Sequence, residues 1–130
     1  MKYVILIHSN PQPWGHPTAD RLPEQQDLTA QERDAGARAF DEGFAEVIGR
    51  GELVHAAALA APTTARLLRW ENGERVASDG PYAAGEEHLA GLFVIDVETP
   101  DRAEEIAGLF GARGETVELR PVMDEDADEA

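Results

Sequence analysis

Residues 2–8 read KYVILIH and residues 89–97 read LAGLFVIDV, and these two runs decide the fold. In each run apolar side chains occupy odd and even positions alike, as Ile5, Leu6 and Ile7 do. Successive side chains of a β-strand point to opposite faces of its sheet, so a strand with this pattern is covered on both faces. We therefore predict that both runs are central strands.

Capping signals predict two helices. Residues 29–32 read TAQE, a capping box, and the apolar side chains that follow recur at helical spacing as far as Gly51. Residues 99–100 read TP, a cap followed by proline at the first helical position, and this second helix is expected to end at Gly111.

A hairpin is predicted in the middle of the chain. Asn72-Gly73 is typical of a two-residue turn with positive φ angles, and it separates strand-like runs at 64–70 and 74–77. Two further strands are expected at residues 52–59 and 115–123.

The order strand, helix, strand, hairpin, strand, helix, strand predicts an α+β fold with a ferredoxin-like βαβ(ββ)βαβ sheet and both helices on one face. Because the central strands are apolar on both faces, the other face must also be covered. We expect a second copy of the chain to cover it, giving a sheet-to-sheet homodimer. The competing glyoxalase-like βαβββ pair would need three strands after residue 111, where too few residues remain.

The length of 130 residues fits a single domain, which we place at residues 1–123. Within it, residues 10–28 contain four prolines and are expected to form a long loop insert without regular structure. Residues 124–130 form an acidic tail, which we expect to be disordered.

Charge and composition exclude several function classes. The net charge is −15, of which the tail supplies five negative charges, so an acidic body of −10 (−15 + 5) argues against direct binding to nucleic acid. With no cysteine, disulfides, thiolate catalysis and cysteine-bound metals are excluded. No run is apolar enough for a membrane span, and the first residues read as a strand rather than a signal peptide, so we expect a cytoplasmic protein.

Residues 78–82 read SDGPY, a rigid turn in which Gly admits unusual backbone angles and Pro fixes φ. Followed by the run EEHLAGLFVIDV at residues 86–97, it resembles the DGPF signature of YCII-related proteins, with Tyr82 where that family usually has Phe. The resemblance implies a dimeric α+β barrel, in agreement with the element order.

Two residues are the candidate catalytic groups. Asp79 is either a turn former that caps its own backbone or a carboxylate facing a pocket, and the resemblance implies that the DGPF loop lines a pocket. His8 ends the first strand, where its imidazole could carry a proton near neutral pH or serve as a structural side chain.

Four more residues are candidate ligand-binding groups. Tyr82 could donate a phenolic hydrogen bond or simply fill the space of Phe. His55 lies in a strand among small alanines, which indicates either a cavity or close helix packing. Trp14 on the insert could close over a pocket. Asp96 could replace Asp79 as the partner of a histidine.

Some YCII-related proteins resemble cofactor-independent enzymes with a His–Asp pair whose histidine begins the first helix. This chain has no histidine between residues 17 and 54, so such a pair would have to combine His8 or His55 with Asp79 or Asp96. Neither a phosphate-binding glycine loop nor a histidine pair at metal-ligand spacing occurs, so we expect no cofactor and no metal.

Two functions therefore stand open. The favoured one is a non-catalytic or regulatory protein that binds a small molecule or a protein partner, because DGPF proteins resemble companions of extracytoplasmic-function sigma factors. The alternative is a cofactor-independent lyase or isomerase that transfers protons with a His–Asp pair in a pocket of the dimer barrel.

Overall fold

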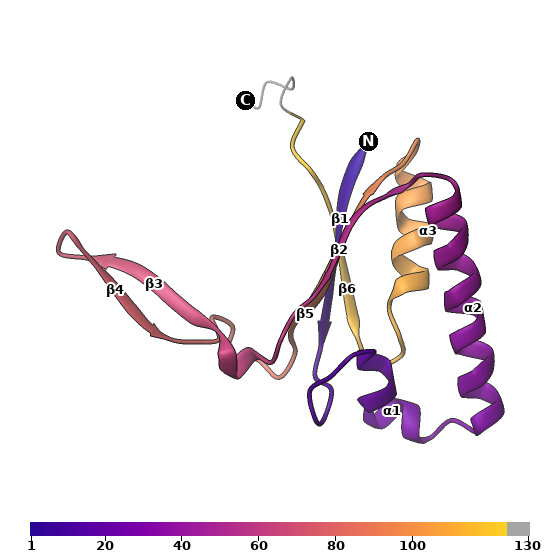
Figure 1. The fold of residues 1–130 in the computed structure, drawn as a ribbon, viewed down its shortest axis with the longest axis horizontal. Helices are drawn as coiled ribbons and strands as arrows, with labels where there is room; N and C mark the ends of the chain where they lie inside the picture. The colour runs from indigo at the N-terminus through magenta and orange to yellow at the C-terminus, as the bar shows by residue number, and fades with distance from the viewer. Residues whose placement is uncertain (125–130) are drawn as a thin grey trace.

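The computed structural model describes residues 1–124, which contain a four-stranded antiparallel sheet in the order β2-β5-β1-β6 (Figure 1). The central strands are β1 (Lys2–Ser9) and β5 (His88–Asp96), and the outer strands are β2 (Leu53–Ala58) and β6 (Thr116–Pro121). The central position predicted for both apolar runs is thereby confirmed, and the connectivity is that of a ferredoxin-like α+β fold.

Both long helices cover the same face of this sheet (Figure 1). In α2 (Ala30–Gly49), the Thr29 hydroxyl accepts a hydrogen bond from the Glu32 amide, and the Glu32 carboxylate accepts one from the Thr29 amide. In α3 (Pro100–Phe110), the Thr99 hydroxyl accepts a hydrogen bond from the Arg102 amide. The sequence signals for both helix starts are confirmed.

The hydrophobic core lies between the helices and one face of the sheet. The aromatic rings of Phe93 on β5 and Phe110 on α3 lie 4.6 Å apart, centroid to centroid. Ile5 and Ile95, from the two central strands, are fully buried. The remaining buried members of this core are Ile7, Val47, Val97, Ala103, Ile106 and Ala107.

The segment 10–28 was expected to lack regular structure, and this expectation is wrong. It contains a 3-10 turn, η1 (Thr18–Arg21), and a single helical turn, α1 (Pro23–Gln26). Proline fits the first turn of a helix because its missing N–H would have no intrahelical partner there. Leu22, only 2% exposed, anchors the segment to the body of the protein.

The predicted hairpin is present as β3 (Arg66–Glu71) and β4 (Glu74–Asp79), which follow the 3-10 turn η2 (Pro62–Thr64). Asn72 and Gly73 have φ angles of 52° and 81°, as the turn prediction requires. The hairpin forms its own two-stranded sheet and projects from the side of the main sheet opposite the helices (Figure 1). We call residues 66–79 the arm.

Among the helices of residues 1–124, none combines the length and the apolarity that crossing a bilayer requires. The predicted acidic tail lies, from residue 125 onward, outside the described residues.

The glycines of α2 give a test of helix packing. A Cβ at Gly43 would collide with the Leu109 side chain of α3, whereas a Cβ at Gly36 would enter open space. Gly36→Ala should stabilise the protein by about 0.5–1 kcal/mol through helix propensity. Gly43→Ala should lose that gain to overpacking, which costs about 1–3 kcal/mol. Urea unfolding at one protein concentration measures the difference, and equal stabilisation by both variants would contradict the packing described here.

Candidate functional site

The face of the sheet that turns away from the helices carries an apolar patch. Ile5 and Ile7 of β1 point into the core, so the side chains between them point the other way. Cross-strand partners share a face, and Val4 pairs with Val94 while Leu6 pairs with Leu92. We call the surface formed by Val4, Leu6, Leu92 and Val94 the bare face; all four side chains are only partly buried.

A histidine–carboxylate pair lies at the edge of the bare face. His8 is the next β1 residue on this side, and Glu118 of β6 lies directly opposite Leu6. The Nε2 atom of His8 is 3.0 Å from the Glu118 Oε1 atom, and both side chains remain partly open to solvent. Because a carboxylate only accepts, Nε2 donates this hydrogen bond, which leaves Nδ1 of the neutral ring as an acceptor.

A second polar contact lies beside this pair. Thr116 lies opposite His8 on β6, and its hydroxyl donates to the Glu87 carboxylate, with 2.8 Å between Oγ1 and Oε1. Glu87 belongs to the segment just before β5. The end of the bare face near His8 is therefore polar and acidic, while its middle is apolar.

The structure does not pair Asp79 with His8. Asp79 ends β4 and forms an ion pair with Arg66 at the base of the arm, and its side chain is 86% exposed. The Gly80 amide next to it donates to the Ala65 carbonyl at 2.9 Å, which closes the arm. Tyr82 is 83% exposed in the segment that follows.

The other candidate residues lie at three separate places. His55 on β2 is opposite Val94, so it shares the side of the bare face, although it is exposed. Asp96 accepts from the N-terminal amine at 3.1 Å. The Trp14 indole Nε1 donates to the carbonyl of Leu59 at 3.0 Å, which attaches the 10–28 segment to the end of β2.

Glu118 is the site residue that the sequence interpretation missed. In a ferredoxin-like sheet the last strand lies beside the first, so the fold alone indicates that a carboxylate of residues 115–123 lies next to β1. The register that places Glu118 rather than Glu115 beside His8 is set by tertiary pairing.

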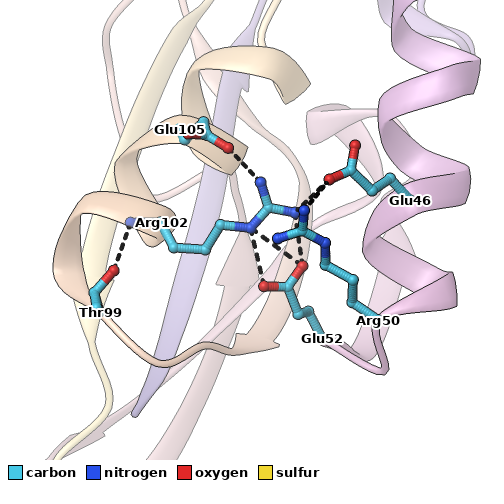
Figure 2. Close-up of polar contacts among 6 residues, drawn as sticks. All are labelled: Glu46, Arg50, Glu52, Thr99, Arg102 and Glu105. Carbon is cyan, nitrogen blue, oxygen red and sulfur yellow. Dashed lines mark hydrogen bonds and ion pairs between the residues drawn. The ribbon is translucent and has the colours of Figure 1, made fainter.

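A second charged cluster joins the start of α3 to the start of β2 (Figure 2). The Arg102 guanidinium donates to both Glu52 carboxylate oxygens, with 2.9 Å from Nε to Oε2 and 2.7 Å from Nη2 to Oε1. It also bonds Glu105 and lies 3.7 Å from Glu46. These bonds from Arg102 hold the pKa of Glu52 below its usual value although burial acts to raise it, and they raise the pKa of Arg102.

Two surface hollows of the single chain are lined by residues other than the four of the bare face. One is lined by residues that include Gln12, Glu24 and Glu87, and the other lies beside Glu52 and Arg102. In the part of the chain that the structure describes, no cluster of three or more histidine and acidic side chains could hold a metal ion.

Two comparisons with known proteins agree. A family model described as the YCII-related domain matches residues 1–125, and this match runs across the 10–28 segment. An uncharacterized protein of Rhizobium meliloti (strain 1021) is 29% identical over 128 residues, covering 94% of this chain and 92% of the relative.

The lowered pKa of Glu52 predicts a pH dependence of stability. A carboxyl whose pKa is lower in the folded state stabilises the fold above its ordinary value of 4.5, and this contribution is lost as the pH falls through the folded pKa. Glu52→Gln should reduce the free energy of unfolding at pH 7 by roughly 2–3 kcal/mol. It should also flatten the fall in stability below pH 4.5.

Urea unfolding between pH 7 and pH 3 measures both effects. Glu105→Gln is the matched control, because that carboxylate is 69% exposed and an exposed pair contributes about 0–1 kcal/mol. Parallel pH profiles for Glu52→Gln and the unmodified protein would contradict the role given to the pair.

Proposed function

We propose that this chain, which belongs to the YCII-related family, binds a small organic molecule at the bare face of its sheet, and that a second copy of the chain closes the site. The observation that carries the proposal is the His8–Glu118 pair, which lies 3.0 Å apart at the edge of an apolar patch. An apolar floor with one hydrogen-bonding pair is the usual composition of a small-molecule site.

The surface area of the chain supports the second copy. A folded monomer of 14.1 kDa should expose about 6,700 Å², whereas this chain exposes 8900 Å². Even if the six residues beyond 124 accounted for on the order of 1,000 Å², more than 1,000 Å² of the excess would belong to the rest of the chain. That is more than the roughly 800 Å² that each partner buries in a standard-sized interface.

The chemistry of the site indicates the kind of ligand. The floor formed by Val4, Leu6, Leu92 and Val94 suits an aromatic or branched aliphatic body. Nδ1 of His8 can accept a hydrogen bond from a hydroxyl or amide group. Glu118, together with the net charge of −15, disfavours anionic ligands.

The same pair supports a second candidate function, a cofactor-independent enzyme. A histidine whose Nε2–H is held by a carboxylate can take up a proton at Nδ1, because the carboxylate stabilises the imidazolium that forms. In that reaction Glu118 would take the place of the aspartate expected from the sequence. The binding function has priority because the apolar floor and the open acceptor at Nδ1 are sufficient for binding, whereas a reaction also needs a substrate proton held within reach of Nδ1.

A protein partner, such as an extracytoplasmic-function sigma factor, remains a prediction from the family resemblance. The acidic surface suits a basic partner, and co-purification at two salt concentrations tests it.

Leu6→Arg should convert the dimer into monomers, because it places a charge in the middle of the bare face. Sedimentation velocity should show at least a tenfold weaker association, which corresponds to about 1.4 kcal/mol. Ala35→Arg is the matched control, since Ala35 is exposed on α2 in the opposite layer. A folded monomer of the unmodified protein at working concentrations would contradict the proposed dimer.

His8→Ala should weaken binding of ligands with one hydroxyl group and an aromatic or aliphatic body. A library of such compounds, screened by methyl NMR, should shift the signals of Val4, Leu6, Leu92 and Val94. Loss of a hydrogen bond to this pair should weaken the best binder by about 10- to 100-fold. His16→Ala is the control, because His16 contacts the Leu59 carbonyl instead. Equal affinities in both variants would contradict the site, and conversion of a bound compound that stops in Glu118→Gln would favour the enzyme.

A further inference from the structure

The arm exposes apolar side chains that its own subunit does not cover. Apart from Leu67, every residue of β3 and β4 is exposed. Leu68 and Trp70 share one side of the ribbon with their cross-strand partners Ala77 and Arg75, and they are 63% and 74% exposed. An isolated two-stranded ribbon is marginally stable in water, so this side of the arm is suited to a surface that covers it.

The direction and length of the arm match the bare face of another copy. The arm leaves the main sheet on the side opposite the helices, which is the side of the bare face (Figure 1). Its strands have six residues each and so extend about 20 Å. The four strands of the main sheet span only about 14 Å between the outer two, so the arm is long enough to cross a whole sheet.

The charges of the arm also fit an acidic second copy. Residues 66–79 contain three arginines and three acidic residues, so the arm is neutral within a chain of net charge −15. Arg66 is paired with Asp79, whereas Arg69 and Arg75 make no ion pair with any residue of 1–124. Arg75 shares the side of Leu68 and Trp70, so Glu118 and Glu87, beside the bare face, offer carboxylates to its guanidinium group.

We propose that the arm of each subunit docks across the bare face of the other, so that Leu68 and Trp70 of one copy cover the apolar patch of the second and Trp70 forms a wall of its ligand site. This inference rests on the proposed function and names the element that closes the site. Trp70 lies opposite the unpaired Arg75, and tryptophan and arginine are both enriched among the residues that contribute most to binding energy in protein interfaces. Two-fold symmetry makes the exchange reciprocal, so that each dimer contains two composite sites.

A single-tryptophan variant tests the docking. Trp14→Phe leaves Trp70 as the only tryptophan. In the dimer its emission should lie at shorter wavelength, and its quenching by acrylamide should be severalfold weaker, than in Trp14→Phe combined with Leu6→Arg. The proposal would be overturned if the two variants gave identical spectra and quenching although sedimentation showed Trp14→Phe as a dimer and the double variant as a monomer.

A mixed dimer tests which copy supplies Trp70. Unlabelled chain is mixed with chain that carries ¹³C in its methyl groups, and contacts between chains are recorded by isotope-filtered NMR. Indole protons of unlabelled Trp70 should contact the labelled methyls of Leu6 and Leu92; contacts confined to one chain would overturn the exchange.

Removal of the arm separates this inference from the proposed function. Because Ala65 and Gly80 are already hydrogen-bonded, residues 66–79 can be replaced by Gly-Gly. The armless chain should associate at least tenfold more weakly and lose affinity for the compounds that bind through His8. If it keeps full dimerisation and affinity, the arm does not close the site, while the His8→Ala and Leu6→Arg results still decide the proposed function on their own.

Discussion

The central strands β1 and β5 carry branched apolar side chains on both faces, and the helices cover only one of them. Fully burying such a side chain contributes about 1.5–3 kcal/mol relative to leaving it exposed, so the four partly buried side chains of the bare face leave several kcal/mol unused. Association costs about 4–15 kcal/mol in lost freedom of motion. The free energy gained by covering one bare face would barely exceed that cost. Two-fold symmetry doubles every contact, and the arms add further apolar area.

The fold was largely predictable because its signals are local. Apolar side chains at odd and even positions alike indicated both central strands, Thr29 and Thr99 marked the helix starts, and Asn72-Gly73 marked the hairpin. The two helical turns of the 10–28 segment were not predictable, because they depend on burial of Leu22 against the body of the protein. Proline content alone indicates where a helix cannot continue, and it does not exclude a single turn that starts at proline.

Only part of the candidate site was predictable, because its two residues are far apart along the chain. His8 could be singled out because it ends an apolar strand next to a long connection. Its partner lies 110 residues away, on a strand whose register depends on the assembled sheet. Asp79 belongs to the most distinctive turn of the sequence, yet in the described subunit that turn closes the base of the arm, where the carboxylate pairs with Arg66.

Two pairs of a carboxylate and a basic side chain differ in burial and in the hydrogen-bonding groups that they leave free. This difference distinguishes a pair that stabilises the fold from one that can bind a ligand. Arg102 and Glu52 are mostly buried, and their mutual hydrogen bonds shift both pKa values in the directions that keep both groups charged. A ligand would have to break those bonds, so this cluster joins elements rather than binding a substrate. His8 and Glu118 share one hydrogen bond at a partly open edge, and Nδ1 of His8 has no partner within residues 1–124. A ligand can therefore bind to this pair without displacing an existing contact, and it would do so beside the apolar patch of the bare face.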